Sequence, residues 1–515
     1  MNSPVRQSSR SSSSVRAVVA GGLAAATVLG VGHLVAVFVD PAASPFYVLG
    51  ATMVDNTPHT LKDFAIRQFG SKDKQVLFAS MAVVMAIGAA LIGVLERRRS
   101  PLGSALLLGL GMLTAVAALS RPIADWWFAA PALVGTLAGI AVLRLLITGG
   151  NRRGAPVAEE PSRRRFLTLA AGAGALALGA ATAGRLLAER LRNIAADRAR
   201  FLLPAPVSPA PAVAPGFSLP VDGITSFVTS NERFYRVDTA LQLPTVTSAD
   251  WRLRVHGMVD RTVEFDMDRL RSRAAVERLV TIACVSNEVG GELAGNARWL
   301  GYPLRDLLAE AGPHSDADML LSRSADGFTA GAPLSAVFDG RDALLAIGMN
   351  GAPLPLDHGY PARLIVPGLY GYVSATKWVV DLEITRFDRA TAYWTERGWA
   401  DRAPIETASR IDVPAAFATI AAGPVTVAGV AWAQRRGIAA VEVRVDEQPW
   451  QPATLAAEYS IDAWRQWTFR WNATPGTHTL TVRSMDGTGQ LQTDVRTPPF
   501  PDGSTGWHTR VVTVR

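Results

Sequence analysis

The sequence is poor in cysteine and in charged residues. Cys284 is the only cysteine among 515 residues, and charged residues make up 18% of the chain. One cysteine excludes an internal disulfide, a zinc site built from cysteines and a cysteine-bound iron–sulfur cluster, because each needs several thiolates. The formal net charge is +7, but the excess arginines cluster beside apolar segments rather than among aromatic residues. That pattern indicates membrane topology and argues against a nucleic-acid partner.

Long apolar runs are abundant in the first 190 residues. Apolar residues make up 49% of the whole chain, and Ala, Leu, Gly and Val dominate residues 15–190. A bilayer core about 30 Å thick needs roughly 20 apolar residues in a helix. We therefore predict an α-helical transmembrane bundle, with four helices in residues 1–150 and a fifth in residues 151–190. The predicted spans are 16–39, 76–95, 102–120, 126–148 and 166–188.

Arginine clusters predict the orientation of these spans. One cluster precedes the first span, one lies between the second and third, and one lies between the fourth and fifth. The positive-inside rule places all three in the cytoplasm, so an odd number of spans leaves everything after residue 190 outside the cytoplasmic membrane. We expect a multi-pass protein in the lipid bilayer with an extracytoplasmic globular part. The clusters are Arg6, Arg10 and Arg16; Arg97, Arg98 and Arg99; and Arg152, Arg153, Arg163, Arg164 and Arg165.

The fifth span begins with a distinctive hexapeptide. Residues 162–167, S-R-R-R-F-L, resemble the twin-arginine export signal, which serves proteins that fold before they cross the membrane. The simpler interpretation is a positive-inside cluster ahead of a helix. Because no convincing small-residue cleavage site follows, we expect the segment to remain as a membrane anchor.

The rest of the chain divides by composition into three parts. Residues 191–216 form a Pro/Ala-rich linker, which favours extended conformations and predicts a semi-rigid spacer. Residues 217–388 contain short apolar runs broken by Gly, Pro and Asp, with helical pieces such as 303–311, and predict an α+β domain. Residues 389–515 alternate like strands between turn signals and predict an immunoglobulin-like β-sandwich with tryptophans in its core.

The only cysteine lies where an apolar strand ends. Residues 281–291 read T-I-A-C-V-S-N-E-V-G-G, so Cys284 leads into a polar, glycine-rich loop. A lone buried cysteine is more often an inert small hydrophobe than a reactive group. A strand end before a permissive loop is also where functional side chains commonly project. These residues alone leave both interpretations open.

Several blocks after Cys284 together resemble a known family. They include A-R-W-L-G-Y-P-L-R-D-L-L at 297–308, S-A-D-G-F at 324–328, and M-N-G-A-P-L-P-L-D-H-G-Y-P-A-R-L-I-V-P-G-L-Y-G at 349–371, with Lys377-Trp378 beyond. They resemble the molybdopterin-binding domain of the sulfite oxidase family. The C-terminal region resembles the β-sandwich dimerisation domain of that family. The resemblance covers about residues 220–515 and implies a molybdenum–molybdopterin cofactor and two-electron oxygen-atom transfer.

The resemblance also implies roles for individual residues. Cys284 matches the thiolate that binds molybdenum, and a soft thiolate suits this metal. His358 and Arg363 match residues that bind the pterin phosphate and ring system. Arginine suits phosphate because its fork of donors can bind in bidentate fashion. The segment that holds the polar end of the cofactor corresponds to Thr376, Lys377 and Trp378. Looser matches for further cofactor contacts are Asn231, Tyr235, Arg236, Ser324 and Asp326.

Three positions predict the catalytic pocket and separate this chain from typical sulfite oxidases. Asn287 is retained after the cysteine, but Glu288 stands where the family has an arginine, and Trp399 stands in place of an active-site tyrosine. Two anions repel in a low-dielectric pocket, so Glu288 would disfavour sulfite. From the family we expect a small substrate. Two reactions stay open, oxidation of a sulfite-like compound and reduction of an S-oxide or N-oxide.

The resemblance leaves the redox partner outside the chain. The sequence holds no H-P-G-G haem segment and no flavin or pyridine-nucleotide motif. We therefore expect a separate electron-transfer partner, a cytochrome or a quinone-linked protein. The dimerisation-type domain suggests a homodimer.

Two other functions compete with this interpretation. The first is an extracytoplasmic cysteine hydrolase or transpeptidase, with Cys284 as nucleophile and His358 as base. The second is a non-catalytic, membrane-anchored binding protein.

Overall fold

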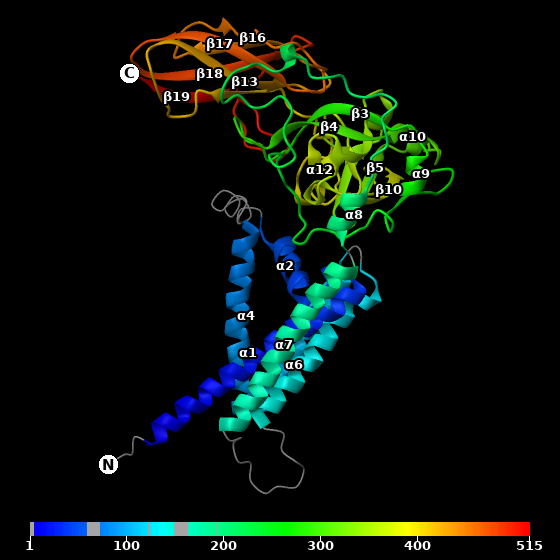
Figure 1. The fold of residues 1–515 in the computed structure, drawn as a ribbon, viewed down its shortest axis with the longest axis vertical. Helices are drawn as coiled ribbons and strands as arrows, with labels where there is room; N and C mark the ends of the chain where they lie inside the picture. Colours follow the sequence, from blue (N-terminus) through cyan, green and yellow to red (C-terminus); the bar gives the residue numbers. More distant parts are fainter. Residues whose placement is uncertain (1–4, 59–72, 122–123, 149–162, 192) are drawn as a thin grey trace. The chain divides into compact units, whose positions relative to one another are not determined.

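The computed structural model describes residues 5–58, 73–121, 124–148, 163–191 and 193–515 (Figure 1). The chain forms two compact units. The first comprises residues 1–193 with 240–243, and the second comprises residues 194–239 with 244–515.

The first unit is helical. Among the described residues, five stretches are long and apolar enough to cross a membrane: 14–39, 75–98, 102–119, 126–148 and 164–200, the last of which extends past the end of this unit. They overlap the five predicted spans. Arg163 begins the last helix, whereas Ser162, Arg152 and Arg153 lie outside the described residues. The helices are α1 (Val5–Val39), η1 (Pro41–Ala43), α2 (Pro45–Asn56), α4 (Asp73–Arg98), α5 (Leu102–Leu119), η3 (Trp126–Ala129), α6 (Ala130–Thr148) and α7 (Arg163–Leu191).

Helix α1 is the centre of this bundle and contacts α4, α6 and α7 (Figure 1). Glycine allows the closest approach. A Cβ atom on Gly21 would lie 2.0 Å from the carbonyl oxygen of Ala89, and one on Gly93 would lie 2.0 Å from that of Ala17. Small residues at a helix interface let two backbones meet in this way, which is a common mode of packing between membrane helices.

The predicted linker belongs to the second unit. After α8 (Ile194–Arg200), the chain is extended up to η4 (Pro215–Phe217). Val207 donates its N–H to the Ala275 carbonyl (2.8 Å), and Ser208 accepts from the N–H of Glu277 (2.9 Å). The segment is thus extended, as the prediction of a semi-rigid spacer requires, and hydrogen bonds tie it to the domain that follows. Its backbone groups pair with the domain, because unpaired polar groups beside a core are costly.

The α+β part of this unit contains two sheets. Their apolar strands enclose a core in which Trp251, Trp299 and Phe265 are fully buried. The helical piece expected near 303–311 is α10. One sheet has the order β3 (Val276–Ala283), β4 (Ala294–Pro303), β7 (Leu344–Met349), β8 (Ala352–Pro353), with β9 (Arg363–Ile365) beside β7; the other has the order β2 (Val263–Asp266), β1 (Arg252–Gly257), β10 (Val379–Thr385), β5 (Met319–Ser324), β6 (Thr329–Pro333). The helices are α9 (Met267–Arg271), α10 (Leu304–Ala309), α11 (Ser335–Phe338), η5 (Leu356–His358) and α12 (Gly371–Ser374), with η6 (Thr395–Arg397) after the sheets.

The C-terminal part is a two-sheet β-sandwich, as predicted, and its first strand begins at Ala408. Trp467 and Trp471 fill its core. Trp432 and Trp464 instead join the core of the α+β part, so the two parts share buried apolar surface. The sheets have the orders β11 (Ala408–Val413), β13 (Gly423–Trp432), β17 (Arg465–Ala473), β16 (Thr454–Leu455) and β12 (Thr419–Ile420), β19 (His508–Val514), β18 (Gly476–Asp486), β14 (Ile438–Val445), β15 (Gln451–Pro452).

Candidate active site

Cys284 lies at the carboxyl end of β3 and is buried, with 8% of its surface exposed. Its N–H donates to the Leu293 carbonyl (2.9 Å), and its carbonyl accepts from the N–H of Asn287 (3.1 Å), which closes the turn that follows. Burial raises the pKa of the thiol, while hydrogen bonds from Ser286 and the charge of Lys377 act in the opposite direction. A bound metal cation would favour the thiolate, so metal binding and loss of the proton are coupled here.

Lys377 forms a buried ion pair beside this thiol. Its Nζ lies 2.7 Å from Oδ2 of Asp238, and the two side chains are 10% and 4% exposed. Burial lowers the pKa of Lys377 to about 8, although Asp238 works against the shift. Nζ also donates to the Asp357 carbonyl (3.0 Å) and lies 4.8 Å from the centre of the Trp378 ring. Sequence reasoning missed Asp238, whose one signal is its position two residues after Arg236.

His358 and Arg363 are both buried and lie against each other. Nε2 of His358 lies 3.1 Å from the Asn231 carbonyl, and burial, with Arg363 beside it, lowers the pKa of the imidazole to about 4. The Arg363 guanidinium donates to the carbonyls of His358 (3.0 Å) and Ala375 (3.3 Å). It also lies 4.9 Å from the centre of the Trp299 ring. Both predicted residues therefore meet in one place.

Arg363 is a buried cation without a counterion in the part of the chain that the structure describes. Its Nε has no hydrogen-bond partner there, and burial lowers the pKa of the guanidinium to about 10. A buried charge without a partner is costly, so such a residue in a native protein calls for an explanation. An anionic ligand would supply the missing partner.

Most of the looser matches also lie in this region. Burial raises the pKa of Tyr235, and the nearby Cys284 raises it further while Arg363 acts to lower it. Burial raises the pKa of Asp326, and its neighbours include Asp238 and Lys377. Arg236 is the exception in exposure, because 40% of its side chain faces solvent while it pairs with Asp238 (2.8 Å).

The remaining three candidates, Asn231, Ser324 and Thr376, are each held by hydrogen bonds to nearby residues. The side-chain oxygen of Asn231 accepts from Nδ2 of Asn350 (2.8 Å), and Ser324 donates its N–H to the Phe328 carbonyl (2.8 Å). Thr376 is buried and its hydroxyl lies 2.7 Å from that of Ser322. These contacts place all three residues in ordered positions within the fold.

The predicted catalytic residues differ in their surroundings. Asn287 accepts the N–H of Leu293 through Oδ1 (2.8 Å) and so holds the loop closed. Glu288 is exposed at a small cleft between this loop and the sandwich, which Tyr370 and Ser504 also line. The expectation of strong repulsion inside a low-dielectric pocket therefore loses its premise, because solvent screens an exposed carboxylate.

Trp399 lies in an aromatic cluster next to α12. Its ring packs against Tyr372 (5.8 Å between centroids) and Phe500 (5.3 Å), and its Nε1 is buried without a partner among the described residues. Helix α12 itself approaches the strand that bears Cys284, since a Cβ on Gly371 would lie 3.7 Å from the Ala283 carbonyl. Trp399 thus reaches the site through Tyr372.

Tyr370 is a residue of this site that sequence reasoning missed. Burial raises the pKa of its hydroxyl, the hydrogen bond from the Glu406 N–H acts to lower it, and the charges of Glu406 and Cys284 raise it. It lies just before α12, within the P-G-L-Y-G stretch that follows Arg363. That stretch is part of the block that resembles the family, but the sequence does not distinguish a tyrosine of the site from an ordinary buried tyrosine.

The donor set fits an anionic cofactor that brings its own metal ligands. Within the described ranges, no group of three or more His, Cys, Asp and Glu side chains could hold a metal ion. A metal at Cys284 therefore needs most of its ligands from elsewhere. Buried Arg363 and Lys377 would neutralise the phosphate of such a cofactor, and aromatic rings flank both cations.

Comparison with known proteins gives two family matches. Residues 240–394 match the oxidoreductase molybdopterin binding domain, and residues 408–482 match a bacterial Ig domain. The chain is 27% identical to sulfite oxidase of Gallus gallus over 336 residues, which covers 55% of this chain and 72% of that protein. It is 28% identical to the mitochondrial sulfite oxidase of Homo sapiens over 322 residues, which covers 53% of this chain and 58% of that protein.

Two further relatives come from bacteria. The uncharacterized oxidoreductase YuiH of Bacillus subtilis is 30% identical over 149 residues, covering 29% of this chain and 72% of that protein. Among solved structures, the sulfane dehydrogenase SoxCD of Paracoccus pantotrophus aligns with a TM-score of 0.49 and 22% identity, over 61% of this chain and 89% of that chain.

Proposed function

This chain belongs to the sulfite oxidase family of molybdopterin-dependent oxidoreductases, and from that premise we propose that it transfers oxygen atoms to or from a small substrate outside the cytoplasmic membrane. One observation carries the proposal. The only thiol of the chain lies at a strand end beside Lys377, and the buried Arg363 has no counterion in the described part of the chain. A molybdopterin supplies both the metal for the thiol and the phosphate for the cations.

Each residue of the site has a role toward that cofactor. When bound, the cofactor supplies a metal that exchanges an oxygen atom and two electrons with the substrate. Cys284 would provide the thiolate ligand, and Arg363 and Lys377 would bind the phosphate. His358, which stays neutral near pH 7 because its pKa is about 4, can hydrogen-bond the pterin without adding charge. The residues Asn231, Tyr235, Arg236, Ser324, Asp326, Thr376 and Trp378 would complete the wall of the site.

The substrate pocket lies on the side of Asn287, Glu288 and Trp399 in this proposal. Both sulfite-like oxidation and reduction of an S-oxide or N-oxide remain within it, since the exposed Glu288 disfavours a dianion only weakly. Electrons would pass to or from a separate cytochrome or quinone-linked protein. The sandwich would provide the surface for a homodimer.

Location is a further part of the proposal. Five apolar helices and three arginine clusters support a multi-pass protein of the cytoplasmic membrane with its catalytic unit outside. The twin-arginine-like segment at the start of α7 supports export of a folded, cofactor-loaded unit.

The hydrolase alternative has no support from the site. A general base for a cysteine nucleophile needs a pKa near the working pH, whereas the pKa of His358 is about 4 and its Nε2 already contacts the Asn231 carbonyl. The family matches likewise overturn the non-catalytic alternative.

Metal and pterin analysis of the full chain tests the proposal. Purified in detergent from a host that makes the pterin cofactor, the protein should carry near-stoichiometric molybdenum. Cys284→Ser should change or abolish the visible absorption of the loaded protein, because the thiolate ligand is lost. The matched control Ser272→Ala, at the exposed residue that follows α9, should leave metal and spectrum unchanged. Folded wild-type protein without molybdenum would contradict the proposal.

A further inference from the structure

The strand that carries Cys284 has two different edges. One edge of β3 pairs with β4, with Thr281 opposite Asn296. On the other edge, Thr281 donates its N–H to the Asp462 carbonyl (2.9 Å), and its own carbonyl accepts from Nε2 of Gln434 (3.0 Å). Both partners belong to the β-sandwich. The sandwich therefore takes the place of a neighbouring strand three residues before the thiol.

The hydroxyl of Thr281 is held from the same side. The N–H of Trp464 donates to Thr281 Oγ1 (2.8 Å), and Thr281 Oγ1 in turn donates to Asn296 Oδ1 (3.0 Å). Thr281 is fully buried. The backbone N–H, the carbonyl and the hydroxyl of Thr281 are thus each hydrogen-bonded to the sandwich.

The loop after Cys284 is tied to the sandwich as well. Arg410 donates to the Gly291 carbonyl (2.7 Å) and is fixed by Asp412 (2.7 Å), in a pair whose side chains are 6% and 8% exposed. The Ser504 hydroxyl donates to the Asn287 carbonyl. Cys284 therefore sits between two points of attachment, Thr281 before it and the 287–291 loop after it.

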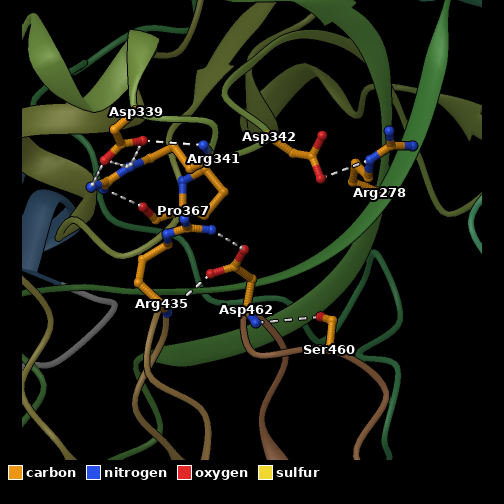
Figure 2. Close-up of polar contacts among 8 residues, drawn as sticks. All are labelled: Arg278, Asp339, Arg341, Asp342, Pro367, Arg435, Ser460 and Asp462. Carbon is orange, nitrogen blue, oxygen red and sulfur yellow. Dashed lines mark hydrogen bonds and ion pairs between the residues drawn. The ribbon is translucent and has the colours of Figure 1, made fainter. Parts of the chain in front are cut away.

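The sandwich segment that meets β3 is itself locked in place (Figure 2). The Asp462 carboxylate accepts the backbone N–H of Arg435 (3.1 Å) and one guanidinium N–H of the same residue (3.2 Å). The N–H of Asp462 donates to the Ser460 hydroxyl (3.3 Å). The carbonyl that Asp462 offers to Thr281 thus comes from a segment with its own polar anchors.

Gln434 has a property that stability alone does not explain. The side chain is buried, and its Oε1 has no hydrogen-bond partner in the described part of the chain. Burying an amide oxygen without a partner is unfavourable, and an apolar residue of the same size would avoid it. Among the residues that the structure describes, the only hydrogen bond of this side chain is the one to Thr281.

We propose that Gln434 is a positioning residue, through which the β-sandwich holds the strand end that presents the Cys284 thiolate to the metal. This inference rests on the proposed function only in taking a metal as the partner of the Cys284 thiolate. The restraint on Cys284 is a property of the chain itself, and it can be measured without the cofactor.

The experiment uses the fact that Cys284 is the only cysteine. The rate of its alkylation by iodoacetamide in the cofactor-free full chain reports how often the buried strand end opens. Gln434→Met should raise that rate roughly three- to tenfold, the factor that corresponds to one net hydrogen bond. The melting temperature should change little, since the variant replaces one unpaired buried atom, Oε1, by another, the Thr281 carbonyl.

Gln466→Met is the matched control. Gln466 is as deeply buried, and it also bridges to the preceding domain, but to Leu219 (2.6 Å) and Thr225 (2.7 Å) rather than to the Cys284 strand. Both of its bonds are satisfied, so this variant should melt at a lower temperature than Gln434→Met. Its alkylation rate well below the melting transition should stay at the wild-type value.

A second pair keeps the test sharp if Gln434→Met fails to fold. Thr281→Val removes the acceptor for Trp464 and should raise the alkylation rate, and Thr281→Ser, which keeps the hydroxyl, should restore it. In the loaded enzyme, Gln434→Met should also alter the visible absorption while molybdenum content stays near that of wild type.

Two outcomes would overturn the proposal. Cys284 alkylation in Gln434→Met could equal that of wild type, or Gln466→Met could raise it as much. If wild-type protein holds no molybdenum, the proposed function fails while the alkylation result still decides whether the sandwich positions Cys284.

Discussion

At the scale of single residues, Arg363 shows how this site trades stability for binding. Its guanidinium is buried, lies over Trp299 and has an Nε without a partner among the described residues. Such a charge destabilises a cofactor-free protein, because two carbonyls and an aromatic ring replace only part of its hydration and no carboxylate among the described residues pairs with it. The same charge is useful once a phosphate arrives. A buried charge without a counterion, which lowers the stability of the native protein, is typical of functional sites.

Replacing Arg363 by Met should therefore have opposite effects on the two forms. The cofactor-free protein should gain about 1–4 kcal/mol of unfolding free energy, as when other buried ionic groups are replaced by apolar ones. The loaded protein should lose most of its pterin and molybdenum. Denaturant unfolding and metal analysis measure the two effects. Arg254→Met, at an arginine whose side chain is 53% exposed, is the control and should change neither. A destabilised cofactor-free Arg363→Met would count against this account.

At the scale of elements, the start of β19 lies against the loop that follows Cys284. His508 Nδ1 accepts the N–H of Ile411 (3.0 Å), so the ring is neutral. A Cβ on Gly290, whose φ is +82°, would lie 2.3 Å from that ring. Burial, together with Arg510, Arg410 and Arg496, lowers the pKa of His508 to about 4, and only Asp412 opposes the shift.

The depressed pKa of His508 predicts how stability depends on pH. The unfolded state binds a proton near pH 6.5 and the folded state only near pH 4, so the stabilisation is present above about pH 6.5 and is lost as the pH falls toward 4. The full effect is about 3 kcal/mol, from 1.36 kcal/mol per pKa unit. His508→Asn, whose Oδ1 can replace Nδ1 as acceptor, should flatten the slope of stability over this range. Tryptophan fluorescence during denaturant unfolding measures it, and equal slopes for both proteins would refute the assignment.

At the scale of the whole molecule, the chain combines a helical unit with a unit built from the α+β and sandwich parts. The two parts of the second unit share a core to which Trp432 and Trp464 contribute. The sandwich is therefore more than an appended module, because removing it would expose that core and the outer edge of β3. Because the chain has a single cysteine, introduced cysteines can report the orientation of the helical unit once Cys284 is replaced.

Cysteine labelling should reveal the topology. In a Cys284→Ser background, Ala212→Cys lies in the exposed part of the extended segment before the catalytic domain, and Arg99→Cys lies between the second and third spans. A membrane-impermeant maleimide should label Ala212→Cys in intact cells and Arg99→Cys only after lysis. The reverse pattern would place the catalytic unit in the cytoplasm.

Several features of this protein follow from local sequence. Apolar length predicted the five helices, because a bilayer-spanning segment needs little beyond its own composition. Alternation and turn signals predicted the sandwich. The block around His358 and Arg363 indicated the cofactor through its resemblance to the family, which was detectable because the block is continuous in sequence.

The sequence by itself determined the family, the membrane-type helices and the position along the chain of the thiol that we propose as the metal ligand. Only the tertiary structure decided which groups meet that thiol. Asp238 pairs with Lys377 across 139 residues, and Gln434 reaches Thr281 across 153. The extended segment at 203–216 likewise joined the domain because strand edges were available there to pair its backbone. Such contacts depend on how whole domains pack, and no local pattern of residues records that.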